Sequence, residues 1–175
     1  MTIEKRAASD LRAQGRRLVG YAATFGTETR IADFTEVVRA GAFQQSIASG
    51  KDILALADHD RGKVLARTKS GTLRLSEDER GLRFELDLPE TTVGNDLLKL
   101  AERGDLGGMS FAFSVAEGGE VWTGDRRELR NVVLHEISVI SSWPAYDGTS
   151  VSARSRQERS SADRRIVLLD LEAAR

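Results

Sequence analysis

Three short stretches of this sequence carry side chains that can take part in acid–base or nucleophilic chemistry. "LADHD" places His59, one of only two histidines, between two aspartates. "GGMSFAF" contains Ser110, and "LHEISVIS" contains Glu136 directly after His135. Histidine is the side chain best suited to accept a proton near neutral pH, serine becomes a nucleophile when a base removes its proton, and a carboxylate can orient the base. The three stretches are far apart in the chain, so this chemistry requires a fold that brings them together.

A purely structural explanation is also open for each of these residues. His59 follows an apolar run and is compatible with a buried structural histidine. The small residues around Ser110 equally suit a strand that packs tightly against another backbone. Glu136 stands on an apolar strand, where a carboxylate is costly unless it is paired, and one of the many arginines could be its partner. The residue pattern alone leaves these alternatives open.

The strand that contains Ser110 has two contrasting faces. Because side chains alternate along a strand, small residues share one face and large apolar residues share the other. The two sets are Gly108, Ser110, Ala112 and Ser114, and Met109, Phe111, Phe113 and Val115. We expect the apolar set to fill the core. The small set leaves room for another molecule to approach the Ser110 hydroxyl.

The strand that contains Glu136 is apolar on both sides, which predicts that both of its faces are covered. One face carries Val133, Ile137 and Val139, and the other carries Val132, Leu134 and Ile140. Strict alternation places Glu136 on the face of Leu134 and Ser138 and places His135 on the opposite face. We therefore expect His135 to be structural and not to share a site with Glu136.

The chain as a whole reads as strands with two short helices inserted. Alternation and β-forming residues predict strands at 16–26, 34–43, 52–59, 61–68, 71–78, 81–89, 107–115 and 127–141. The strands at 71–78 and 81–89 form a hairpin through "EDERG". Helices are expected at 42–49 and 91–105, the second with Gly104 as its C-terminal stop. This order favours a mainly β fold, a closed or nearly closed antiparallel barrel, over alternating βαβ units.

Composition narrows the classes of function. The 175 residues, 40% apolar and 30% charged, suit one globular domain, and 26 basic against 27 acidic residues give no excess that suggests nucleic acid or a membrane surface as partner. The absence of cysteine excludes disulfides, thiolate metal sites and a cysteine nucleophile. Two histidines without a helical His-x-x-x-His pair make zinc improbable, and no phosphate-binding loop is present. We expect no cofactor, no metal, no signal peptide and no membrane span.

The composition changes near the C-terminal end. "SARSRQERSSADRR" is polar and charged, and "IVLLDLEAAR" is apolar with helical spacing. We interpret 1–153 as the folded domain and 154–175 as a polar linker followed by a C-terminal amphipathic helix. This helix docks on the domain or on a second copy, or it belongs to a detachable tail.

Several of these stretches, in this order, resemble the prohead proteases of tailed bacteriophages. They are "GYAATFG", "VVRAGAF", "LADHD", "GDLGGMSFAF" and "LHEISVISSWPAY", and the resemblance runs from about residue 16 to about residue 153. The combination of "GxSFxF", preceded by a helix, with "xEISVxSxPA" is specific. These are serine proteases of head maturation, distantly similar in fold to the herpesvirus assembly protease, assemblin. The resemblance implies the barrel of that type.

The resemblance also implies roles for the three residues. Ser110 would be the nucleophile, His59 the general base and Glu136 the acidic residue that orients the histidine. The herpesvirus relatives use a second histidine as third member, so His135 is the competing candidate. Asp58 and Asp60 are weaker ones, because neighbours on a strand point to opposite faces from His59. Backbone amides of a nearby loop should form the oxyanion hole.

The implied function is a phage-encoded serine endopeptidase. It would work in the interior of the prohead, within the host cytoplasm, and would process the scaffold, the major capsid protein and itself, which gives the polar linker a role as the self-cleavage region. Its partners would be the capsid protein and scaffold, with no nucleic acid and no membrane, and a homo-oligomer stays open. Two alternatives are a non-catalytic barrel domain that binds capsid or scaffold, and an unrelated bacterial hydrolase of small esters.

Overall fold

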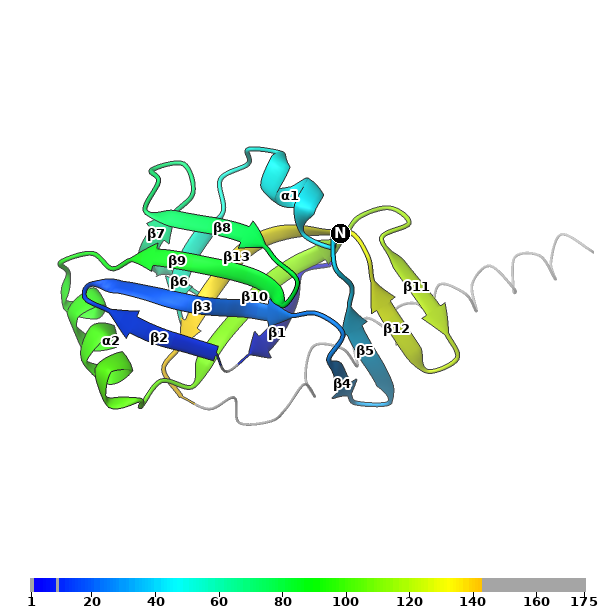
Figure 1. The fold of residues 1–175 in the computed structure, drawn as a ribbon, viewed down its shortest axis with the longest axis horizontal. Helices are drawn as coiled ribbons and strands as arrows, with labels where there is room; N and C mark the ends of the chain where they lie inside the picture. The colour runs from blue at the N-terminus through cyan, green and yellow to red at the C-terminus, as the bar shows by residue number, and fades with distance from the viewer. Residues whose placement is uncertain (1, 9, 143–175) are drawn as a thin grey trace, which may run out of the picture.

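The expected mainly β class is confirmed by a computed structural model, which describes residues 2–8 and 10–142 (Figure 1). The strands in this part of the chain are β1 (Glu4–Ala8), β2 (Asp10–Gln14), β3 (Arg17–Thr24), β4 (Glu28–Ile31), β5 (Phe34–Val38), β6 (Leu54–Ala57), β7 (Asp60–Arg67), β8 (Leu73–Glu77), β9 (Gly81–Asp87), β10 (Gly108–Val115), β11 (Glu120–Thr123), β12 (Arg126–Leu129) and β13 (Val132–Ile140). The helices are α1 (Gln44–Ala48) and α2 (Thr92–Arg103). The expected C-terminal helix and the division at residue 153 lie outside the described residues.

The described strands form three sheets, with the orders β1-β10-β13-β6-β7, β2-β3-β9-β8 and β11-β12-β5-β4. We call the first the site sheet, because it contains β10 with Ser110, β13 with Glu136, and β6 and β7, which flank His59. Most pairings are antiparallel, as expected, but β13 pairs with β6 and β12 pairs with β5 in parallel. No ring of paired strands closes within the described residues, so the closed barrel stays a prediction.

The core lies between the site sheet and the β2-β3-β9-β8 sheet (Figure 1). As alternation predicted, the large apolar residues of β10 and β9 face it, and they are nearly fully buried. They include Met109, Phe111 and Phe113 on β10, and Leu82, Phe84 and Leu86 on β9. The small-residue face of β10 therefore points to the other side of the site sheet, away from this core.

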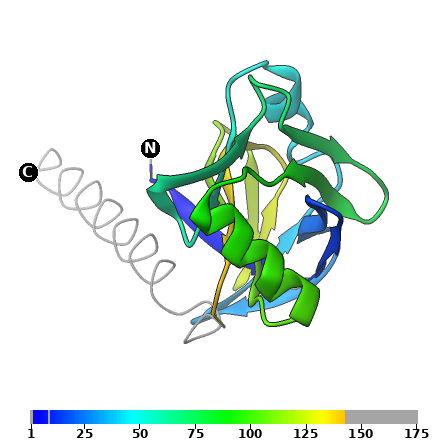
Figure 2. The ribbon, with the colours of Figure 1, turned by 90° about the vertical axis from the view of Figure 1, so that its left-hand side faces the viewer.

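Helix α2 lies at one end of the molecule and faces the viewer in Figure 2. The Thr91 side chain caps its N-terminus by accepting a hydrogen bond from the Gly94 amide at 3.2 Å. Gly104 ends it in the left-handed conformation, with φ of 76°, which glycine adopts without a Cβ clash. The expected helix and its stop are both confirmed, and the helix leads directly toward β10.

The sequence analysis missed β1, which lies at the edge of the site sheet beside β10. Its inner side is held by a buried ionic cluster that joins it to β5 and β12. Arg127 donates to Glu4 at 2.7 Å and to Glu36 at 2.9 Å, and Arg6 donates to Glu36 at 2.6 Å and Glu4 at 2.8 Å. Burial alone would raise the pKa of Glu4, but the hydrogen bonds and charges of Arg127 and Arg6 outweigh it, and the pKa lies below its ordinary value.

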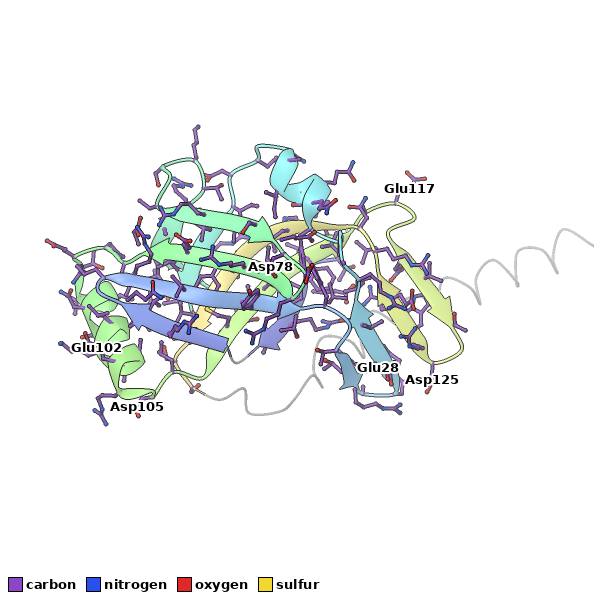
Figure 3. The ribbon with its side chains drawn as sticks, in the orientation of Figure 1. Glu28, Asp78, Glu102, Asp105, Glu117 and Asp125 are labelled. Atoms are coloured by element: carbon purple, nitrogen blue, oxygen red, sulfur yellow. The ribbon has the colours of Figure 1, made fainter. Side chains whose placement is uncertain are left out.

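Replacement of Arg127 by methionine should therefore lower the free energy of unfolding by about 3–5 kcal/mol at pH 7, because it removes a buried cation that Glu4 and Glu36 share and leaves Arg6 alone to balance both carboxylates. The loss is measured by urea denaturation. Arg30→Met is the matched control, since Arg30 is 62% exposed and lies 3.6 Å from Asp125 at the tip of the β11–β12 hairpin (Figure 3). An exposed pair of this kind contributes below about 1 kcal/mol.

The difference between wild type and Arg127→Met should also shrink as the pH falls below the ordinary pKa of a glutamate. In the wild type the lowered pKa of Glu4 gives stability that is present above that pH and is lost on acidification. In the variant, protonation removes the unpaired charge and relieves the penalty. Equal losses for Arg127→Met and Arg30→Met would contradict the stabilising role of this cluster.

Candidate active site

The structure brings Ser110, His59 and Glu136 together in one hydrogen-bonded chain. His59 Nε2 lies 2.9 Å from Ser110 Oγ, and His59 Nδ1 lies 2.6 Å from Glu136 Oε1. Ser110 and Glu136 are buried, and the His59 side chain is 17% exposed. The hydroxyl, the imidazole and the carboxylate thus follow one another in an order that lets the imidazole take the hydroxyl proton while the carboxylate holds the ring in place.

The registers of neighbouring strands bring Ser110 and Glu136 to the same side of the site sheet. In the pairing of β10 with β13, Ser110 stands opposite Ser138, and Ala112 stands opposite Glu136. Because paired residues of an antiparallel ladder share a face, Glu136 projects on the small-residue face of β10, diagonal to Ser110. The small side chain of Ala112 leaves the space over this part of the strand to other groups.

His59 reaches the same face through a tight turn between β6 and β7. Ala57 pairs with Asp60, so Asp58 and His59 are the two turn residues, and both have positive φ, 50° and 60°. Two-residue hairpin turns of type I′ need positive φ at both positions, where asparagine and glycine are usual. A histidine in this conformation is strained, and such strain is often found at functional sites.

Neither of the two aspartates beside His59 bonds to the imidazole in the described residues, and Asp58 instead stabilises the turn. The Asp58 carboxylate accepts hydrogen bonds from the Ser141 amide and from the Ser141 hydroxyl, both at 2.8 Å. Asp60 accepts a bond from the Gly62 amide and pairs with Lys63. The weaker candidates of the sequence analysis therefore have partners of their own, and Asp58 ties the His59 turn to the end of β13.

The placement of His135 on the face opposite Glu136 was wrong, because β13 contains a β-bulge. Ala112 stands opposite Glu136, but the next residue of β10, Phe113, stands opposite Leu134, so His135 is an extra residue without a partner position. Leu134 accordingly belongs to the core, not to the face of Glu136. The His135 ring lies on the same side of the sheet as Glu136, away from the core, with Nε2 at 2.8 Å from the Ser114 hydroxyl.

The surroundings of His135 lower its pKa and so favour the neutral imidazole. Burial lowers its pKa most, the nearby Glu136 carboxylate raises it, and the positive charges of Arg61 and Lys51 lower it further. Its bonded partner is Ser114, four residues from Ser110 on the same face of β10. His135 thus lies beside the candidate site and has no bond to His59 or Ser110 among those of the described residues.

Ser138 adds a second hydrogen bond to the Glu136 carboxylate. Its hydroxyl donates to Oε1 at 3.3 Å, and the residue is fully buried. The sequence analysis placed Ser138 on the face of Glu136 but gave it no role. Its position two residues after Glu136, on the same face of the strand, could have indicated this hydrogen bond, because a buried carboxylate needs more than one donor.

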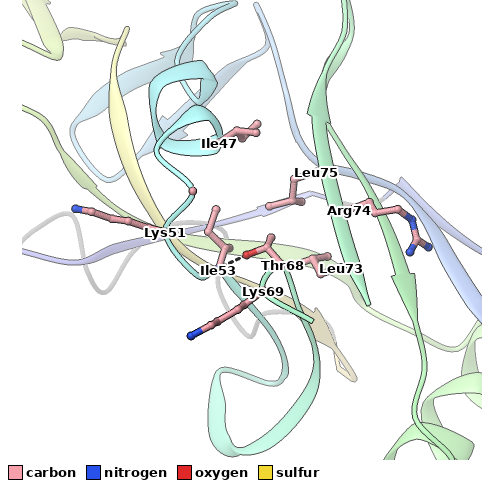
Figure 4. Close-up of a pocket in the computed structure, with 9 residues that line it drawn as sticks. Ile47, Lys51, Ile53, Thr68, Lys69, Leu73, Arg74 and Leu75 are labelled. Carbon is pink, nitrogen blue, oxygen red and sulfur yellow. Dashed lines mark hydrogen bonds between the residues drawn. The ribbon is translucent and has the colours of Figure 1, made fainter. Parts of the chain in front are cut away.

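A pocket between α1, the segment that follows it, the β7–β8 turn and β8 is separate from these residues (Figure 4). Its apolar lining comes from Ile47, Ile53, Leu73 and Leu75. Lys51 and Lys69 also line it, with their ammonium groups extending outward (Figure 4). The lining of this pocket does not include Ser110, His59 or Glu136, so the pocket is not part of the candidate active site.

Two further properties of the described residues bear on the class of protein. They contain no group of three histidine, aspartate or glutamate side chains suited to hold a metal ion. The two helices of this part of the chain are also too short and too polar to cross a membrane.

A serine, a histidine and a glutamate bonded in this order form the arrangement that serine hydrolases share across unrelated folds. A model of the caudovirus prohead serine protease family matches residues 2–163. The chain therefore belongs to the family of caudovirus prohead serine proteases, and the resemblance found in the sequence is confirmed. No curated protein and no solved structure matches the chain.

The geometry around His135 gives a test of its role. His135→Gln should keep most of the reactivity of Ser110, because the glutamine amide can still bond to Ser114 and the bonds of His59 are unchanged. Reactivity is measured as the rate of labelling by a fluorophosphonate, next to a thermal melting curve. A complete loss of labelling with an unchanged melting curve would transfer the third role from Glu136 to His135.

Proposed function

We propose that this protein is a serine endopeptidase in which Ser110 is the nucleophile, His59 is the general base and Glu136 orients His59. The observation that supports this best is the continuous hydrogen-bonded chain from Ser110 through His59 to Glu136. The three residues come from β10, the β6–β7 turn and β13, so no local sequence preference explains their meeting. Membership of the family supports the reaction type.

In the proposed mechanism, Ser110 Oγ attacks the carbonyl carbon of the scissile peptide bond while His59 Nε2 takes the hydroxyl proton. The tetrahedral intermediate collapses, His59 returns the proton to the leaving amine, and an ester to Ser110 remains. A water molecule then attacks this ester, with His59 again accepting and returning a proton. Glu136 takes up no proton from His59 in this mechanism and stabilises the imidazolium that forms twice in the cycle.

Burial adapts the site to this chemistry. In a low-dielectric environment the attraction between the Glu136 carboxylate and an imidazolium is stronger than in water, and the bond to Ser138 holds the carboxylate in place. The negative charge that develops on the substrate oxygen needs donors as well. We propose that backbone amides of a nearby loop supply them.

The proposed biological role is maturation of the phage prohead. The enzyme would act inside the immature head, cleave the scaffold or the major capsid protein, and then cleave itself. The family supports a role in the head, and the particular substrates, the self-cleavage and a closed barrel of the assemblin type are parts of this proposal. A non-catalytic domain that binds capsid or scaffold is the alternative, and it predicts no reaction of Ser110 with a fluorophosphonate.

Substitution of the three residues tests the mechanism directly. Ser110→Ala and His59→Ala should each lower the rate of peptide cleavage by about 10⁴–10⁶-fold, and the double variant should be hardly slower, because the members act as a unit. Glu136→Gln should be milder but still severe, since the imidazole loses its orienting charge. Cleavage is followed by mass spectrometry on co-expressed capsid protein. Additive losses in the double variant, with all variants folded, would count against the assignment.

Self-cleavage makes a separate prediction for the polar segment at 150–165. The purified protein should shorten with time at a bond in this segment, which is rich in charge and small polar residues. Ser110→Ala should stay intact under the same conditions. If both forms shorten at the same rate in intact-mass measurements, the cleavage comes from a contaminating protease.

A further inference from the structure

Strand β1 runs directly beside the proposed nucleophile. It pairs with β10 so that Ala7 stands opposite Ser110 and Lys5 stands opposite Ala112. Paired residues share a face of the sheet, so Lys5 and Ala7 project on the side where the hydroxyl of Ser110 lies. Both are exposed, whereas Ser110 and Ala112 are buried. The exposed side chains of Lys5 and Ala7 therefore border the Ser110 hydroxyl on this face.

The opposite face of β1 is fixed with unusual firmness for an edge strand. Glu4 and Arg6 alternate with the exposed residues and enter the buried ionic cluster with Glu36 and Arg127. The Glu4 and Arg6 side chains are 5% and 9% exposed. Edge strands are often short and mobile, but this one is held by several charge-assisted bonds on one side. Its exposed side is thereby presented to solvent at a fixed distance from Ser110.

The charge on this side of the site is unbalanced. No described residue forms an ion pair with Lys5. The carboxylates nearest to the site are already engaged, Glu136 by His59, Asp58 by Ser141 and Asp60 by Lys63. The exposed ammonium group of Lys5 is thus free to bind an acidic group that arrives with the substrate.

Apolar surface flanks the same face at both edges of the site sheet. Ile3 and Val64 are the exposed large apolar side chains of the described residues, at 43% and 46%. Ile3 continues the alternation of Lys5 and Ala7 one residue before β1. Val64 stands opposite Leu56, and Leu56 stands opposite Ser138. Because Ser138 in turn stands opposite Ser110, Val64 belongs to the line of paired residues that crosses the sheet at Ser110. An extended chain that crosses Ser110 can cover apolar surface in this way.

We propose that β1 is a substrate-recognition strand, in which Lys5 binds an acidic side chain of the substrate and Ile3 contacts an apolar one farther along. This inference rests on the proposed function and adds the class of sequence that is cleaved. Strand spacing and rise place the Cα of Lys5 about 8 Å from that of Ser110, which is about two to three residues of extended chain. The acidic residue should therefore lie within about three residues of the scissile bond.

The test is a cleavage profile of the full-length protein on a library of 14-residue peptides, read by mass spectrometry, which covers both sides of the cut. The wild type should enrich Asp or Glu at one position within about three residues of the bond. Lys5→Glu should lower kcat/KM for the best acidic peptide about tenfold or more, mainly through KM, and should favour the same peptide with lysine at that position.

Lys99→Glu is the matched control, because it makes the same change of charge on α2, where Lys99 is 76% exposed beside Glu102 (Figure 3). It should keep the wild-type profile. The wild type and Lys99→Glu should react with a fluorophosphonate at rates within about twofold, since Lys99 does not belong to the reacting chain of residues.

Labelling separates the two hypotheses. If Ser110 is labelled and peptides are cleaved, but the wild type shows no acidic preference or Lys5→Glu keeps the wild-type profile, the recognition strand is wrong and the proposed function stands. A wild type that cleaves no peptide overturns both. If wild-type Ser110 does not react at all, the proposed function fails and this inference fails with it. An acidic preference that Lys5→Glu inverts and Lys99→Glu leaves intact supports it.

Discussion

The arrangement of this site depends on the register between β10 and β13. The single extra residue at His135 shifts the ladder, so that Glu136 lies diagonal to Ser110 and Leu134 enters the core. Without the extra residue, the pairing of Phe113 with Leu134 would place His135 opposite Ala112. Glu136 would then point into the apolar core, because a register slip of one residue exchanges the two faces of a strand. The bulge therefore determines which titratable group accompanies His59.

The buried groups of the site are compatible with the fold only as a connected set. A carboxylate at the position of Glu136 is costly unless donors surround it, and His59 and Ser138 are those donors. The His59 turn adopts an unfavourable backbone conformation, and Asp58 offsets part of that cost through its bonds to Ser141. The carboxylate of Glu136 on β13 thus depends on His59 from the β6–β7 turn, and that turn depends on Ser141 at the end of β13.

The sequence predicted the elements with long, regular patterns and missed those without them. The alternation of β10 and the helical spacing of α2 were strong enough to identify both, and the family motifs indicated Ser110, His59 and Glu136. Strand β1 was missed because its inner face is charged, with Glu4 and Arg6 satisfied only by distant partners. The bulge was missed because alternation assumes an unbroken ladder. The turn of His59 was missed because it lacks the Asn-Gly or Asp-Gly pair that usually indicates a two-residue hairpin turn.

The interleaving of the site sheet has a consequence for the order in which the protein is made. The β8–β9 hairpin divides the chain into a first part that supplies β1, β6 and β7 and a second part that supplies β10 and β13. His59, the proposed base, emerges from the ribosome with the first part, and Ser110 and Glu136 emerge with the second, so the complete site sheet requires β13. A nascent chain that ends before β13 lacks Glu136, and one that ends before β10 also lacks Ser110, so the proposed site cannot form until both strands have been made.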